Sequence, residues 1–336
     1  MRRSRCLAPI SLAAIVGCLL AAPRVSQASG FDRPSALALE LDGAAVGFVH
    51  EATGGDPGAN VITTPGPGGA FTKHVGNVTF SDIELQVGSG LGPAFYDWIA
   101  KSWTAQPVAK SGAILFADVN LQVSRRKDFT NGWVTRTSLP AFDGASRDPV
   151  WISVKIKAEQ TRLKAGAGTI PSDLAAKGPR PLSANGYRLE IPGLDCTRVR
   201  KIDPFTIEMR TSNDATGSSR DGIVTPTGLN VSDLVVTLPE ASADSWFDWM
   251  NSFVVQGNNG EAQEKNGDLV ILDGQSEVAR VHFVHLGIHS LGTDTDTAAN
   301  AVRSVVARLY CEQASLEWKG GEGNVLNVRA FGRSDE

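Results

Sequence analysis

The feature that most constrains the fold of this chain is an internal repeat. The stretch FYDWIAKSW, at residues 95–103, has a near-copy 151 residues downstream in WFDWMNSFV, at residues 246–254. In both, an aromatic pair is followed by Asp, Trp and an aliphatic residue. Further matches recur in the same order at offsets of 150 to 155, namely residues 39–43 with 189–193, 81–83 with 232–234, 110–115 with 265–270, and 158–160 with 311–313. Five ordered matches with so little drift predict two copies of one domain.

The domain boundaries follow from the repeat and from the composition around it. We expect copy 1 at residues 29–164 and copy 2 at residues 187–318. The segment between them, residues 165–186, is rich in Gly, Ala, Pro and Ser, which is typical of a linker and leaves room for one helical turn at residues 172–177. Residues 319–336 are predicted to form a loosely ordered C-terminal tail.

The N-terminus predicts export. Arg2, Arg3 and Arg5 precede an uncharged apolar run, and a small-residue cleavage site follows at residues 26–28. This layout is typical of a signal peptide at residues 1–28, and the run is too short for a membrane span. Cys18 loosely fits a lipoprotein cleavage box, and the first two arginines loosely fit a twin-arginine signal. We therefore expect a periplasmic or extracellular protein, with lipoprotein anchoring at Cys18 as the lesser alternative.

The charge balance and the cysteines limit the partners of the mature chain. Cleavage after Ala28 removes four arginines and no acid, which leaves 28 basic and 36 acidic side chains and a formal net charge of −8. Such a chain is a poor general binder of nucleic acid or anionic membranes, because both are densely negative. Cys196 and Cys311 remain, and they form one candidate disulfide whose pairing stays open.

Composition and periodicity predict a mainly β fold. The chain has 35 Gly and 17 Pro, and its alternating apolar segments are typical of short strands between turns. Each copy is predicted to hold about six strands and one short helix, arranged as a β-sandwich or barrel. The predicted strand regions are residues 36–49, 78–87, 112–118, 132–139 and 150–161 in copy 1, and residues 187–202, 230–238, 267–273, 277–288 and 303–316 in copy 2.

The repeated aromatic motif predicts the helix. Its apolar residues have the spacing of one helical face, Phe95, Trp98, Ile99 and Trp103 in copy 1 and Trp246, Trp249, Met250 and Phe253 in copy 2. Large aromatics at this spacing indicate core packing rather than a ligand site. The aromatic pairs are completed by Tyr96 and Phe247. Asp97 and Asp248 are the acids common to both motifs, and an early helical position would explain them through the helix dipole, without catalysis.

The ordered motifs resemble the tail-tube protein family of contractile phages and related injection systems, including the phage T4 tail tube and the type VI secretion tube proteins. The matching motifs are LELDG at residues 39–43, SDIEL at 81–85, YDWI at 96–99, GAILFAD at 112–118, Trp133 followed by Leu139-Pro140, and the final strand with Glu159. Copy 2 is more divergent, because Pro192 replaces the acid of the first motif and nothing matches Pro140.

This resemblance implies a structural role. Family members are two packed β-sheets closed by one helix, and they form six-membered rings that stack into tubes. A tandem duplication would build such a ring from three chains, with other tail-like components as further partners. This chain differs from the usual family pattern, which has one domain per chain and no signal peptide. The alternative is an exported β-sandwich binding module, such as an adhesin or glycan binder, and a hydrolase with an unrecognised site is a third reading.

Three histidines offer a candidate metal site. His282, His285 and His289 lie within eight residues. On an extended strand, however, successive side chains alternate between faces, so the three do not converge without a bulge. Copy 1 has no matching histidines. The sequence also lacks a G-x-S-x-G elbow, a phosphate-binding P-loop and an H-E-x-x-H motif. We therefore expect no enzymatic activity, no metal and no cofactor.

Overall fold

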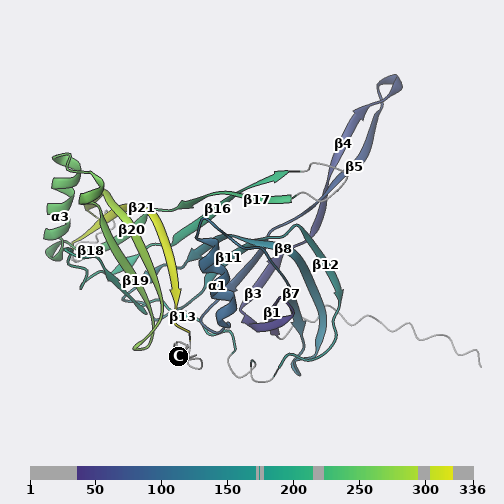
Figure 1. Ribbon diagram of the computed structural model, residues 1–336, viewed down its shortest axis with the longest axis horizontal. Coiled ribbons are helices and arrows are strands. Elements are labelled where there is room, and N and C mark those ends of the chain that lie inside the picture. Colours follow the sequence, from purple (N-terminus) through teal and green to yellow (C-terminus); the bar gives the residue numbers. More distant parts are fainter. Residues whose placement is uncertain (1–35, 172–173, 175–177, 215–222, 294–302, 321–336) are drawn as a thin grey trace, which may run out of the picture. The chain divides into compact units, whose positions relative to one another are not determined.

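The computed structural model describes residues 36–171, 174, 178–214, 223–293 and 303–320 (Figure 1). The predicted signal peptide with Cys18, most of the predicted linker turn, and the tail beyond residue 320 lie outside these ranges. Among the described residues, no helix has the length and apolar character needed to span a membrane.

Most of copy 1 lies in a strongly bent antiparallel sheet. Its strands follow the order β2-β1-β7-β8-β11-β6-β3. Strand β8 is long enough to serve two groups of partners, pairing with β7 and β12 through its first half and with β11 through its second half. The strands are β1 (Ala36–Leu41), β2 (Ala44–Val49), β3 (Glu51–Gly54), β6 (Ile83–Val87), β7 (Lys110–Ala117), β8 (Val123–Leu139), β11 (Ile152–Lys157) and β12 (Gln160–Ala165).

Copy 2 repeats this strand order. Its sheet runs β14-β19-β20-β21-β18-β15-β9, so that β14, β19, β20, β21, β18 and β15 take the places of β1, β7, β8, β11, β6 and β3. The mainly β fold predicted from the sequence is confirmed. The strands are β9 (Phe142–Asp143), β14 (Tyr187–Glu190), β15 (Lys201–Ile202), β18 (Leu234–Pro239), β19 (Lys265–Asp273), β20 (Ser276–Thr293) and β21 (Ser304–Trp318).

Each copy also has a long hairpin and a helix. The hairpins are β4 (Pro57–Pro65) with β5 (Phe71–Phe80), and β16 (Phe205–Asp214) with β17 (Ile223–Val231). The helices are α1 (Pro93–Ser102) and α3 (Asp244–Met250), and α3 continues into a π-helical turn at Asn251–Val255. Single 3₁₀ turns occur at Pro67–Gly69, Glu240–Ser242 and Glu261–Gln263, and a short pair joins β10 (Pro149–Val150) to β13 (Leu182–Ser183). The predicted linker thus contributes a strand to a sheet.

The repeated Ser-Asp motif marks a corner rather than the middle of a strand. The sequence predicted continuous strands at residues 78–87 and 230–238, and both predictions were wrong at this point. The Ser81 hydroxyl accepts the backbone N–H of Asp56 at 2.9 Å, and the Ser232 hydroxyl accepts that of Thr206 at 2.8 Å. These side-chain bonds to residues distant in sequence replace ladder pairing at the corner, where the hairpin ends and the next strand of the sheet begins.

The aromatic motif forms the predicted helix and buries one face of it. Phe95 and Trp98 have no exposed surface, and Trp98 donates its indole N–H to the Val108 carbonyl at 2.8 Å. Tyr96 is equally buried and stacks on Trp318 of copy 2, with ring centroids 3.4 Å apart. In copy 2, Trp246 and Trp249 are buried. The buried face of α1 therefore packs against residues of both copies.

Three members of the motif depart from the expected roles. Asp97 and Asp248 were predicted as helix-start residues, but the helices begin at Pro93 and Asp244, a full turn earlier, and neither helix has a side-chain cap. Both acids are exposed. Phe247 is 42% exposed, because the helical face it occupies points away from the sheet.

The copies also share local detail beyond the strand order. Arg126 pairs with Glu40 at 2.8 Å, and its counterpart Arg280 pairs with Glu190 at 3.0 Å. In copy 2 the guanidinium additionally bonds Glu277, and that bond holds the pKa of the carboxyl down at about 2. Each of these arginines joins the longest strand of its copy to the first strand by an ion pair. The same contact therefore stabilises the bent sheet in both copies.

Candidate assembly surface

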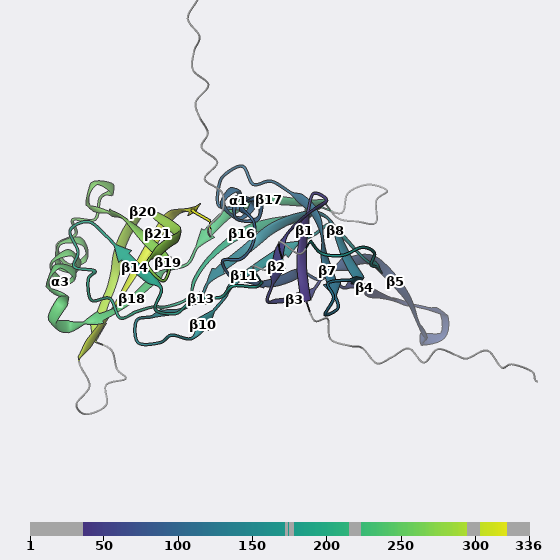
Figure 2. The same ribbon diagram turned by 90° about the horizontal axis from the view of Figure 1, so that it is seen from below.

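A strand of copy 2 pairs with a strand of copy 1 within the chain. Residues 205–208 of β16 run antiparallel to residues 136–139 of β8, in a register that sets Phe205 opposite Leu139. We call this pairing the seam. It extends the sheet of copy 1 by the whole β16–β17 hairpin (Figure 1, Figure 2). The seam is thus an example of strand addition to a sheet edge.

Apolar burial and polar pairing both hold the seam. Phe205, Leu139 and Ile207 are at most 3% exposed. On the other face of the strands, Arg136 and Glu208 form an ion pair at 2.6 Å with both side chains about two-fifths exposed. A pair this exposed adds about 1 kcal/mol or less, so the buried face supplies most of the stability.

In a second pairing, copy 1 supplies the added strand and copy 2 supplies the sheet edge. Strand β9 of copy 1 adds to the edge of the copy 2 sheet by pairing with β15, which sets Phe142 opposite Ile202. Both side chains are fully buried. Each copy therefore donates backbone to the sheet of the other, and a single apolar core runs through both.

In copy 1, the hairpin that corresponds to β16–β17 has no strand of the other copy paired with it among the described residues. The β4–β5 hairpin, which corresponds to β16–β17, pairs within itself and projects from the copy 1 strands (Figure 1). Its large apolar side chains face solvent, with exposed fractions of 63% for Val61, 53% for Ile62, 69% for Phe71 and 70% for Val75. Exposed apolar side chains gathered in this way are typical of surfaces that contact other proteins.

The acceptor strand of the seam also has a counterpart with an open edge. In copy 2, β20 takes the place of β8, and its residues 287–293 pair with β21 on one side. Strand β19 covers β20 up to Leu286. The described part of the chain places no strand on the remaining edge of residues 287–293. Among the described residues, the chain thus leaves both the β4–β5 hairpin and this edge of β20 without a strand partner.

The β4–β5 hairpin was missed in the sequence. Residues 57–80 contain β-branched pairs and a Pro-Gly turn, which are hairpin signals. Their apolar residues do not alternate with polar ones as in a half-buried strand, because the hairpin has no buried face within the chain. The signal was therefore one of β propensity and turn residues without periodicity.

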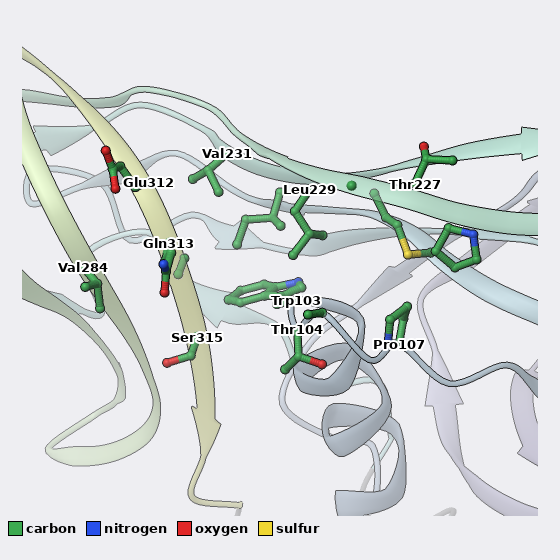
Figure 3. A pocket seen from close by; sticks show the side chains of 16 residues that line it. Trp103, Thr104, Pro107, Thr227, Leu229, Val231, Val284, Glu312, Gln313 and Ser315 are labelled. Atoms are coloured by element: carbon green, nitrogen blue, oxygen red, sulfur yellow. The ribbon is translucent and has the colours of Figure 1, made fainter.

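A cavity lies beside the seam. It is partly open to solvent, has a volume of about 760 Å³ and is lined mainly by apolar side chains of both copies, with Trp103 below Leu229 in the view of Figure 3. Met209 and Ile207 of the seam hairpin complete the wall, and Glu312 and Gln313 of β21 close one side. Its size suits a small apolar ligand or inserted side chains.

The candidate disulfide is not formed in this structure. Cys196 and Cys311 are both free thiols. Cys311 lies on β21 as expected, but Cys196 lies in the loop after β14, where the sequence predicted a strand. Burial raises the pKa of both thiols to about 11. Both are therefore protonated and unreactive near neutral pH.

The three histidines occupy separate sites. His282 contacts Asp268 at 2.7 Å, and His289 contacts Asp233 at 3.0 Å. His285 lies in a bulge of β20 where it pairs with β19, and it contacts Glu264 at 2.8 Å. Each imidazole thus pairs with a different carboxylate, and the three-histidine arrangement considered from the sequence does not form.

Comparisons with known proteins give matches among solved structures. No protein-family model and no curated protein matches the chain. A chain in the structure of the anti-feeding prophage cap, a tube-terminating cap, is 22% identical over 41% of this chain and 95% of its own length, with a TM-score of 0.36. A chain of the extended PVC sheath–tube complex, from an extracellular contractile injection system, is 20% identical over 40% and 93%, with a TM-score of 0.35.

A third solved structure, Hcp1 from Flavobacterium johnsoniae, is 14% identical over 40% of this chain and 95% of its own, with a TM-score of 0.25. Each match therefore spans about the length of one copy. The names of the first two structures include a tube.

Proposed function

We propose that this chain is a non-enzymatic structural subunit of a ring or tube, in which the seam inside one chain is repeated between chains. The observation behind this proposal is the seam itself. It joins a hairpin of one copy to the longest strand of the other, and the same chain presents a second such hairpin and a second such strand edge.

The geometry of this contact is heterologous. The β4–β5 hairpin of one chain would pair with residues 287–293 of the next, as β16 pairs with β8 within the chain. A head-to-tail contact of this type closes into a ring when its rotation permits and otherwise forms an open filament. Because each chain supplies two positions, three chains would fill a six-position ring, and stacked rings would make a tube.

Burial of the hairpin would stabilise the contact. Val61 and Val75 are cross-strand neighbours and are both mostly exposed. Burying one such side chain in the contact would stabilise it by about 1.5 kcal/mol or more. Hydrogen bonds between the paired backbones would fix which residues lie opposite each other. The N-terminal pattern supports assembly outside the cytoplasm, in the periplasm or beyond it, and the acidic mature chain supports protein partners over nucleic acid or membrane.

The experiment measures the mass and shape of the particles formed by the purified chain. We expect particles of three chain masses by mass photometry and rings of uniform pore size by negative-stain electron microscopy. The double variant Val61→Ser with Val75→Ser should shift the particles toward single chains. The matched control is Val255→Ser, which changes a valine that is 72% exposed on the π-helical turn. Single chains at high concentration for the unmodified protein would refute the proposal.

The cavity beside the seam favours one alternative function, an exported β-sandwich module that binds a ligand such as a glycan. Trp103 and other side chains of both copies line it. A chain that stays monomeric and binds glycans on an array, with binding lost on Trp103→Ala, would support this alternative over the ring.

A further inference from the structure

A histidine and two glutamates of copy 2 meet on one face of the β20–β21 pair. Ligand atoms of Glu264, His285 and Glu312 all lie within 4.8 Å of one another. His285 and Glu312 face each other across the two strands, because their flanking residues are paired in register. Glu264 immediately precedes β19 and approaches from the neighbouring strand. Two paired strands and the residue before a third strand thus bring one imidazole and two carboxylates together.

The two inner members of this group are held in place. The Glu264 side chain is only 9% exposed, and it accepts the Tyr310 hydroxyl at 2.6 Å on one oxygen and contacts His285 Nδ1 at 2.8 Å with the other. Tyr310 reaches it by lying across Gly287, where a Cβ would come within 2.0 Å of the ring. The carboxylate is therefore fixed by its surroundings.

A β-bulge directs His285 toward the glutamates. Two residues of β20 oppose one residue of β19 here, and His285 has a φ of +58°, in the left-handed region. The Asn266 side-chain oxygen accepts its backbone N–H at 3.1 Å. Bulges re-aim side chains that a regular strand would place on the opposite face. This is the convergence that strict alternation of strand residues does not allow.

Copy 1 has the same bulge without the same chemistry. Asn131 takes the place of His285, with a φ of +48°, and its backbone N–H is accepted by Ser111 at 3.2 Å. Its side-chain amide donates to Glu159, the counterpart of Glu312, at 2.7 Å. Ala109 precedes Lys110 where Glu264 precedes Lys265. The backbone device is therefore common to both copies, whereas the imidazole and the inner carboxylate are specific to copy 2.

The spacing of these atoms suits a metal ion. Imidazole nitrogen and carboxylate oxygen bind zinc at about 2.0–2.2 Å, which puts neighbouring ligand atoms of a tetrahedral site about 3.3–3.6 Å apart. His285 Nδ1 and Glu264 Oε2 lie 2.8 Å apart, so they need to separate by only about 0.5–0.8 Å to admit the ion. Glu312 is exposed and free to adjust its rotamer. Two carboxylates also supply the negative charge that offsets a divalent cation, and Glu261 lies 3.8 Å from His285 Nε2.

We propose that Glu264, His285 and Glu312 form a binding site for one divalent transition-metal ion of the zinc type. The ion takes the place of the hydrogen bond between His285 Nδ1 and Glu264, and the displaced proton passes to Nε2 of the same ring or to solvent. Glu312 supplies the third ligand, and water completes the sphere. An imidazole among the ligands favours zinc over magnesium or calcium, which prefer oxygen alone. Tyr310 orients Glu264 from behind, as outer partners of metal ligands commonly do. The site occurs once per chain and does not depend on ring formation.

The test is calorimetric titration of Zn²⁺ into the metal-free full chain. We expect one site per chain, and an affinity lowered at least about tenfold by His285→Asn or by Glu264→Gln. Asparagine is the residue that copy 1 uses at this bulge, so His285→Asn retains the backbone and folds. The matched control is His289→Asn, which removes a histidine of the same strand that pairs with Asp233 instead.

Circular dichroism and the thermal midpoint of each variant report that it is folded. Zinc affinity of His289→Asn should stay within twofold of the unmodified chain, and Mg²⁺ should give no heat of binding at the same concentrations. Absence of Zn²⁺ binding by the unmodified chain would overturn the proposal. Equal losses in His285→Asn and His289→Asn, or unchanged affinity in His285→Asn, would overturn it as well.

Discussion

The seam can be tested through Phe205→Ala. Phe205 is 1% exposed and lies between the copies, opposite Leu139 of β8, with its ring edge-to-face with Phe283 at 5.2 Å. Truncating a buried phenylalanine to alanine costs about 3–5 kcal/mol through lost transfer energy and the remaining cavity. About 0.5–1.5 kcal/mol of this belongs to the aromatic pair. The backbone pairing of β16 with β8 is unaffected by the change.

The measurement is urea unfolding followed by tryptophan fluorescence, at a chain concentration where the protein is monomeric. We expect the midpoint to fall with little change in slope, giving a free energy of unfolding lower by about 3–5 kcal/mol. The matched variant is Phe71→Ala on the free hairpin, where the side chain is 69% exposed. Its effect on unfolding should stay within about 0.5 kcal/mol, because nothing within the chain covers that ring.

Two outcomes would refute this reasoning. A loss below about 1 kcal/mol for Phe205→Ala would mean that the apolar face does not hold the seam. A loss above about 1 kcal/mol for Phe71→Ala in the monomer would mean that the β4–β5 hairpin packs within the chain and is not available to another copy.

Three further predictions concern stability. Tyr96→Phe removes a buried hydroxyl that donates to a backbone carbonyl, so we expect a loss of about 1–2 kcal/mol in thermal unfolding, and a neutral result would contradict it. Gly287→Ala forces a Cβ into the Tyr310 ring, so we expect a loss of about 1–3 kcal/mol and weaker quenching of tyrosine fluorescence by the adjacent carboxylate; full stability would refute the close contact. Glu277 has its pKa lowered from 4.5 to about 2, mainly by Arg280, so its contribution to stability is present above pH 4.5 and is lost as the pH falls toward 2. We expect Glu277→Gln to be less stable than the unmodified chain above pH 4.5, and the difference in unfolding free energy between the two to shrink as the pH falls toward 2. A difference that stays constant over this interval would contradict the assignment.

Sequence periodicity predicted the elements that bury one face. The helix at Pro93–Ser102 was visible because Phe95, Trp98 and Ile99 recur at helical spacing and form its buried side. The alternating strands were visible for the same reason. Periodicity did not predict where the polar residues would interrupt a strand. Ser81 and Ser232 each end a strand through a side-chain bond to a residue distant in sequence.

The candidate metal group was hidden for a different reason. In a regular strand, alternation would point the His285 side chain to the opposite face of the sheet from Glu264. The bulge turns it toward Glu264. The sequence does carry one signal, because Asn131 and His285 occupy equivalent places in the repeat, and both residue types tolerate a positive φ. The seam was hidden because no local pattern encodes which strand a hairpin will join.

The repeated bulge has a consequence for imaging any assembly of this chain. Copy 1 and copy 2 share a backbone but place asparagine and histidine at the same point. Averaging images under sixfold symmetry would superimpose these side chains and halve the density of whatever histidine binds. Threefold averaging keeps the alternation, so the order of symmetry imposed during reconstruction decides whether the chemical difference between the copies is visible.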